Sequence, residues 1–130
     1  MIANLEWTTD KENYYSENIS LTKNKIKNKN LPQYWLHCIF DVNDGGTIEA
    51  KIIKNGEIVE TYNEENKIEF FYEINLNEDY GTYTYEVILR NVLNGESSIM
   101  IVPHQKIQVE IKSDFDKDSF LNGFIDGITE

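Results

Sequence analysis

Cysteine is nearly absent from this chain of 130 residues, in which Cys38 carries the only thiol. One cysteine cannot close a disulfide within the chain, and no Cys-x-x-Cys or closely spaced Cys/His pair gives the signature of a zinc site. Disulfide-rich and zinc-stapled folds are therefore excluded. A domain of this length buries enough apolar surface to fold without such links, and we expect neither a metal nor a cofactor.

Long apolar runs are also missing. No stretch approaches the roughly 18 apolar residues of a membrane span. The N-terminal residues 1–7 lack the basic start and the apolar core of a secretory signal. We therefore expect a soluble chain that is made in the cytoplasm and has no membrane partner.

Positive charge is scarce, because 12 Lys and Arg stand against 23 Asp and Glu, for a net charge of −11. Such a charge opposes binding to phosphate backbones, so nucleic acid is not expected as a partner. The single basic cluster comprises Lys23, Lys25, Lys27 and Lys29. It predicts a solvated loop or a lysine-protected edge strand within residues 23–32, or alternatively a docking strip for an acidic partner.

Apolar residues alternate with polar ones through most of the chain, which predicts strands with one buried side. The expected buried positions are Leu36, Cys38 and Phe40; Ile48, Ala50 and Ile52; Ile68, Phe70, Tyr72, Ile74 and Leu76; Tyr83, Tyr85, Val87 and Leu89; and Ile107, Val109 and Ile111. Short strands at this spacing, without a convincing helix before residue 113, predict an all-β sandwich or barrel.

Turn signals separate these strands. Asn55-Gly56 predicts a two-residue hairpin, because both central residues of a type I′ turn need a positive φ. Pro103 predicts a bulge or a switch between sheets. Residues 4–9 and 19–21 are interpreted as a split first strand. We place the domain at residues 1–112 and an acidic, Phe-rich tail at residues 113–130.

The tail carries more apolar surface than a solvated segment needs. We expect it to dock on a groove of its own domain or on a neighbouring protein, through Phe115, Phe120, Leu121, Phe124, Ile125 and Ile128. Part of it has the spacing of a short amphipathic helix. Asp114, Asp116 and Asp118 have the spacing of calcium ligands, but Ser119 and Ile125 stand where a calcium loop has Gly and Glu, so no metal site is assigned.

Catalytic constellations are not evident. His37 and Cys38 are neighbours on a predicted strand, so their side chains point to opposite faces and cannot form a dyad. Glu69 and Glu73 are interpreted as solvated carboxylates and not as a glycosidase pair. Four aromatic residues, Trp7, Tyr34, Trp35 and Phe71, suit a sugar-binding platform. Alternatively, Trp35 and Phe71 are covered by the N-terminal segment or by a neighbouring subunit.

The segment Asp79-Tyr80-Gly81-Thr82-Tyr83-Thr84-Tyr85 resembles the D-x-G-x-Y-x-C signature of immunoglobulin-like domains. The resemblance implies an antiparallel sandwich of about seven strands and a tyrosine corner, with Tyr83 buried and its hydroxyl bound to the backbone. Tyr85 stands where the family has its second cysteine, and Cys38 falls near the position of the first. The family's buried tryptophan is also missing.

Disulfide-free immunoglobulin-like domains serve in bacterial surface proteins and in bacteriophage capsids and tails. The resemblance therefore implies a non-enzymatic structural or binding module. The favoured setting is a bacteriophage virion, as a capsid decoration or tail accessory protein that is assembled in the host cytoplasm and bound to a protein partner or to its own copies. The alternatives are a carbohydrate-binding or adhesion module of a secreted bacterial protein, and an inhibitor that mimics nucleic acid.

Overall fold

The computed structural model describes residues 4–23, 32–42, 45–92, 99–101 and 106–113. These residues form strands and connections, with no helix among them. The strands are β1 (Asn4–Thr8), β2 (Ile19–Lys23), β3 (Trp35–Asp41), β4 (Thr47–Lys54), β5 (Glu57–Glu65), β6 (Lys67–Glu73), β7 (Gly81–Val92), β8 (Ile99–Ile101) and β9 (Ile107–Ser113).

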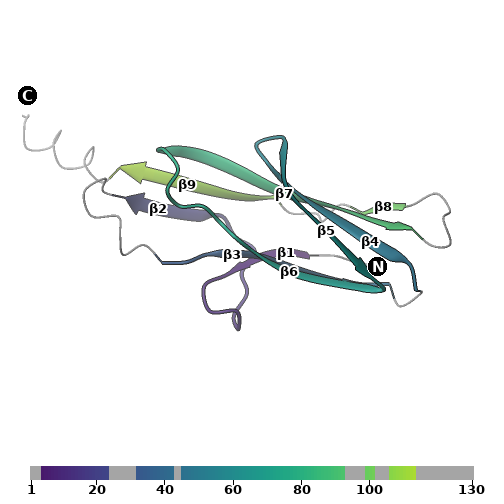
Figure 1. The fold of residues 1–130 in the computed structure, drawn as a ribbon. Coiled ribbons are helices and arrows are strands. Elements are labelled where there is room, and N and C mark those ends of the chain that lie inside the picture. Colours follow the sequence, from purple (N-terminus) through teal and green to yellow (C-terminus); the bar gives the residue numbers. More distant parts are fainter. Residues whose placement is uncertain (1–3, 24–31, 43–44, 93–98, 102–105, 114–130) are drawn as a thin grey trace, which may run out of the picture.

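Two sheets lie face to face in two layers (Figure 1). The small sheet has the order β1-β3-β6, and the large sheet has the order β2-β9-β7-β4-β5, with β8 paired to β7. The prediction of an all-β fold is confirmed. Because β8 and β9 both pair with β7, the chain stays in one sheet across this segment and the proposed switch between sheets is wrong. Pro103 itself and Asn94-Gly95 lie outside the described residues.

The N-terminal segment is divided between the sheets, as the split first strand predicts. β1 runs antiparallel to β3 in the small sheet, with Leu5 opposite Cys38. β2 runs parallel to the last strand, β9, in the large sheet, with Ile19 opposite Val109. Residues 9–18 therefore connect one layer to the other.

Two turns have the backbone that the sequence requires. In the hairpin between β4 and β5, Asn55 has a φ of 50° and Gly56 a φ of 86°, as a type I′ turn demands. Between β5 and β6, Asn66 also has a positive φ, of 70°. There its amide donates to Gly46 O, and its carbonyl and side-chain oxygens accept from the amides of Val42 and Gly45.

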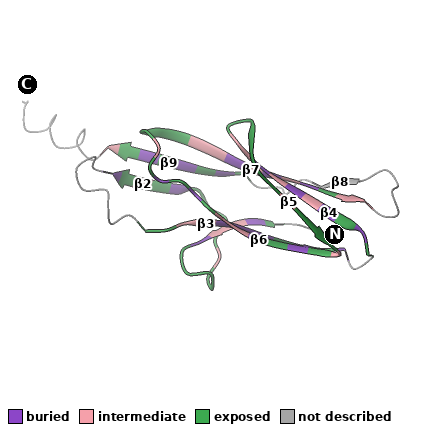
Figure 2. Cartoon of the chain, viewed as in Figure 1, coloured by how far each residue is buried: buried purple, intermediate pink, exposed green. Residues whose placement is uncertain are grey.

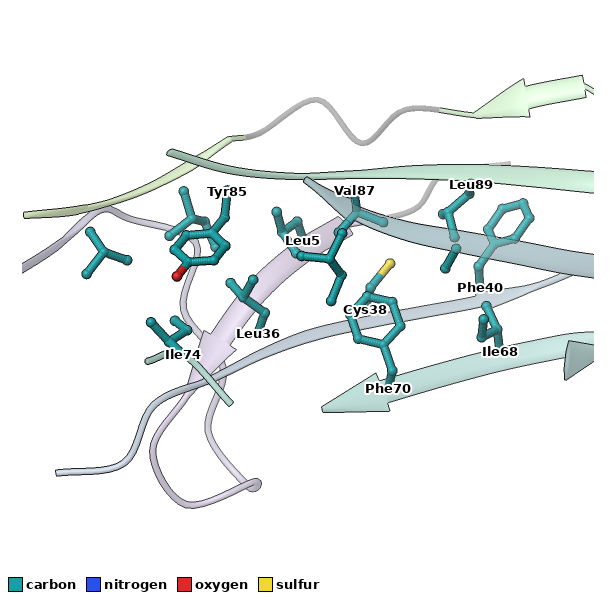
Figure 3. Packing of buried hydrophobic residues seen from close by; sticks show 14 of the residues in the cluster. Leu5, Leu36, Cys38, Phe40, Ile68, Phe70, Ile74, Tyr85, Val87 and Leu89 are labelled. Carbon is teal, nitrogen blue, oxygen red and sulfur yellow. The ribbon is translucent and has the colours of Figure 1, made fainter. Parts of the chain in front are cut away.

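The inner faces of the two sheets form the apolar core (Figure 3). The predicted alternation is confirmed for most positions, since the buried set includes Leu36, Cys38, Phe40, Ile48, Ala50, Ile52, Ile68, Phe70, Tyr85, Val87, Leu89, Ile107, Val109 and Ile111. Tyr72 and Tyr83 are only partly buried. β6 ends at Glu73, so Ile74 and Leu76 are buried from the connection that follows the strand.

The prediction that the basic cluster is solvated is wrong for its first residue, Lys23. It ends β2 and its exposed fraction is only 6%. Its Nζ donates to Leu76 O at 3.1 Å and to Glu78 O at 2.7 Å. The aliphatic stem can be buried because the ammonium finds two carbonyl acceptors at its end. The residues that follow it in the cluster lie outside the described residues.

Lys23→Met tests this contact. The substitution keeps most of the stem but leaves two carbonyls of the connection without their donor, which should lower the free energy of unfolding by about 1 to 3 kcal/mol. Lys112→Met is the matched control, because Lys112 is exposed on the neighbouring strand β9 and should change stability by less than about 0.5 kcal/mol. Equal effects of the two variants in denaturant melts would contradict the assigned contact.

Candidate functional site

The outer face of the small sheet gathers a histidine, two carboxylates and three rings. We call this group the outer cluster and define it as Glu6, Lys11, Tyr14, Trp35, His37, Glu69 and Phe71. His37 occupies the centre of the face on β3, opposite Glu6 of β1 and Phe71 of β6. Glu69 lies two residues from Phe71 on β6 and is therefore on the same face. The cluster therefore spans all three strands.

His37 is enclosed although it points away from the core, with an exposed fraction of 4%. Its Nδ1 lies 3.3 Å from Glu6 Oε1, and its Nε2 lies 2.7 Å from Glu69 Oε2. The Tyr14 ring covers it at a centroid distance of 4.4 Å, and the Phe71 ring at 4.8 Å. Both ring nitrogens are thus engaged by carboxylates, and aromatic rings pack against the imidazole.

The connection between β1 and β2 supplies the cover. In Figure 1 this loop, residues 9–18, hangs beneath β1 and β3 on the side away from the large sheet. Lys11 places its Nζ 4.6 Å from the Trp35 ring centroid and 5.1 Å from that of Phe71. Both distances suit a cation–π contact. Backbone hydrogen bonds between Trp7 and Tyr15, of 2.7 and 2.9 Å, close the base of the loop.

Asp10 fixes the loop from within. Its Oδ1 accepts the amides of Glu12 and Asn13, each at 2.8 Å, and its Oδ2 accepts Asn13 Nδ2 at 2.8 Å. These bonds, led by the Asn13 amide, hold the pKa of the Asp10 carboxyl well below its usual range. Thr8 Oγ1 accepts the Lys11 amide at 2.8 Å. Such local bonds shape a turn in which Lys11 has a positive φ of 60°.

The charges of the outer cluster act on Tyr14. Desolvation within the cluster, and then the negative charges of Glu69 and Glu6, raise the pKa of the Tyr14 phenol. The phenol is therefore neutral at physiological pH, and its oxygen donates to Lys11 O at 3.0 Å.

The four aromatic residues of the predicted sugar platform do not share one surface. Trp35 and Phe71 belong to the outer cluster and lie under Lys11, so their cover by the N-terminal segment is confirmed. Trp7 and Tyr34 instead pack against the core. Their ring centroids are 5.3 Å apart, and Tyr15, which sequence reasoning missed, lies 4.7 Å from Trp7. Glu69 binds His37. The interpretation of Glu69 as a solvated carboxylate missed this contact.

Cys38 lies on the face opposite to its neighbour His37, as the strand alternation predicts. Its exposed fraction is 0%, and Figure 3 shows the thiol in the core between the two sheets. Burial, and then the charge of Glu6, raise the pKa of the Cys38 thiol to about 12. The thiol is therefore protonated at neutral pH and is not a nucleophile there.

The Tyr83 hydroxyl donates to Asp79 O at 2.6 Å, which is the bond that the tyrosine-corner motif predicts. The expected burial of Tyr83 is wrong, because its ring is only half-buried and Lys54 Nζ covers it at 5.0 Å. Gly81 has a φ of 153°, a backbone that L side chains rarely adopt. Tyr85 is buried in the core, where desolvation strongly raises its pKa.

Tyr85 lies at the level of Leu36 and not of Cys38. Its ring centroid is 6.5 Å from that of Tyr72, and Tyr72 is the cross-strand partner of Leu36. Cys38 is paired instead with Phe70, two residues further along the sheet.

Several predicted sites lie outside the described residues. They are the tail positions Phe115, Phe120, Leu121, Phe124, Ile125 and Ile128 and the candidate calcium ligands Asp114, Asp116 and Asp118. Among the residues that are described, no three His, Cys, Asp or Glu side chains come together to hold a metal ion. Those residues also contain no helix long and apolar enough to cross a membrane.

No protein-family model matches this chain. No curated protein matches it either.

Native Cys38 should resist alkylation. At pH 8 we expect iodoacetamide to label the folded protein at least about 100-fold more slowly than the protein in 6 M guanidinium, because burial removes both access and the thiolate. The measurement is intact mass against time. Rapid stoichiometric labelling of the native chain would contradict the buried position of the thiol.

Tyr83→Phe removes the hydroxyl that caps Asp79 O. Because the bond lies at the surface and water can replace the donor, we expect the free energy of unfolding to fall by about 0.5 to 1.5 kcal/mol. Denaturant melts measure the loss. A neutral substitution would show that the bond to Asp79 does not stabilise the corner.

Proposed function

We propose that this protein is a non-enzymatic structural or binding module on an immunoglobulin-like sandwich. The observation that carries the proposal is the enclosure of Cys38 and His37 within the described part of the chain. A nucleophilic thiol must be accessible and ionised, whereas Cys38 is buried with a raised pKa. A general base needs a nitrogen within reach of substrate, whereas both nitrogens of His37 face carboxylates under a cover of rings.

The strand order supports the immunoglobulin-like part of the proposal. In such sandwiches strands A, B and E share one sheet, and strands C, F and G share the other. The order β1-β3-β6 corresponds to A, B and E, and the order β9-β7-β4 corresponds to G, F and C. The corner residue Tyr83 lies near the start of β7, as in strand F of the family.

The setting we propose is a bacteriophage virion, where the chain serves as a capsid decoration or tail accessory protein. Support comes from the family resemblance and from the net charge of −11, which favours protein partners over nucleic acid. A single sandwich exposes edges and faces that suit contact with an assembled particle.

Purified particles test this setting. Particles induced from the bacterial strain that carries the gene are separated on a density gradient and quantified by mass spectrometry. The proposal expects the chain to band with capsid or tail proteins in a fixed stoichiometric ratio. If the chain stays entirely in the soluble fraction while particles band normally, the virion role is wrong.

A second candidate is glycan binding, and one observation favours it. Tyr15 is 41% exposed beside Trp7 and Tyr34, which form a small aromatic shelf. Flat rings of this kind stack on sugar faces. A glycan array with the full chain should then give hits that Tyr15→Ala abolishes and that Tyr80→Ala, a change at another exposed tyrosine, leaves intact. An array without hits would remove this candidate.

A further inference from the structure

β6 is an edge strand of the small sheet, and no described strand pairs with its outer side. β6 pairs with β3 over its whole length without a register shift. Ile74 N donates to Tyr34 O, and hydrogen-bonded pairs alternate along an antiparallel ladder. The backbone groups of Ile68, Phe70 and Tyr72 therefore point toward β3. Those of Lys67, Glu69, Phe71 and Glu73 point toward the free edge, where no described strand pairs with β6.

The edge of the large sheet that β5 forms is protected, in contrast to the edge of β6. Opposite Ile52 and Ile53 the register of β5 shifts and leaves Val59 unpaired, which is a β-bulge. Glu60 and Glu64 pair with Ile52 and Ile48, so these two glutamates share the inner face of the sheet. Bulges and inward charges are the means by which proteins block edge pairing.

β6 has none of these devices. The residues on its inner face are Ile68, Phe70 and Tyr72, and it contains neither a proline nor a bulge. A seven-residue edge without a proline, a bulge or an inward-pointing charge can add a further strand.

β5 lies beside this edge and makes its surroundings acidic. The Tyr62 ring of β5 stacks on the Phe70 ring of β6, with centroids 4.8 Å apart and planes at 6°. Desolvation, and then the charge of Glu60, raise the pKa of Tyr62. Glu60 also raises the pKa of Tyr72, again after desolvation. Glu60 is therefore close to both strands.

The segment that contains β5 and β6 is strongly negative. Residues 57–73 contain six glutamates and one lysine, a net charge of −5. All six glutamates are exposed, and in Figure 2 β5 is exposed along nearly its whole length. A second copy of this chain would bring the same acids against them, so like charges oppose pairing between two such edges. A basic partner has the complementary charge.

We infer that the free edge of β6 docks an extended basic segment of a partner protein, which adds to the small sheet as a fourth strand. Main-chain hydrogen bonds to Lys67, Glu69, Phe71 and Glu73 supply the pairing, as in other cases of strand addition. Apolar residues of the segment face the Tyr62 and Phe70 rings. Its basic residues, which alternate onto the opposite face, lie on the side of Glu69 and Glu73. The inference rests on the proposed binding role and names the surface and partner class for it.

An alternating Lys–Val nonapeptide is the probe for this site, used with the full chain at low salt. Binding should slow hydrogen exchange at the amides of Lys67, Glu69, Phe71 and Glu73. Two further peptides carry N-methyl groups on one or the other set of alternate amides. One set faces β6, so one of these peptides should bind at least about 10-fold more weakly and the other should bind unchanged.

Two double variants test whether the negative charge beside the edge of β6 contributes to peptide binding. E60Q/E64Q should weaken binding of the unmethylated peptide by about 10-fold, because each change removes a charge beside the edge. E17Q/E110Q removes two exposed charges elsewhere and should have no effect beyond about 2-fold.

Three outcomes would overturn the inference: no binding at 1 mM peptide, equal binding of both methylated peptides, or concentration-dependent self-association that protects the same β6 amides without peptide. Self-association of this kind would show that a second copy of the chain, and not a basic segment, occupies the edge of β6. If the peptide fails while the chain still bands with particles, the docking edge is wrong and the proposed function stands.

Discussion

The division of the N-terminal segment between two sheets is the constraint on which the rest of this structure depends. β1 completes the small sheet beside β3, and β2 completes the large sheet beside β9. The connection must therefore leave one layer and enter the other. It folds over the outer face of the small sheet, where it encloses His37, and it delivers Lys23 to the connection between β6 and β7.

The same division determines which groups can meet a partner. Cys38 is buried between the inner faces of the sheets. Both nitrogens of His37 contact carboxylates of β1 and β6, and the loop over the small sheet covers the imidazole with the Tyr14 ring. Side chains of the outer surface and the strand edges stay accessible, and the edge of β6 combines an unpaired ladder with an acidic border. This edge is the surface at which we propose that a partner protein binds.

The sequence predicts the features that depend on local patterns. Period-two alternation locates the inner faces, and Asn55-Gly56 gives the hairpin, because strand geometry and a positive φ are short-range requirements. Lys23 was missed because no pattern indicates that two distant carbonyls will accept its ammonium. The enclosure of His37 was missed for the same reason, although Thr8 and Asp10 carry the signal of a side-chain-capped turn.

Interstrand proton contacts in the full, isotope-labelled chain test the central claim most directly. If the N-terminal segment is divided between the sheets, nuclear Overhauser effects should link Ile19 to Val109 in a parallel register and Leu5 to Cys38 in an antiparallel one. The ring of Tyr14 should also contact His37. Contacts that place β1 and β2 in one sheet, or that leave Tyr14 far from His37, would contradict the account.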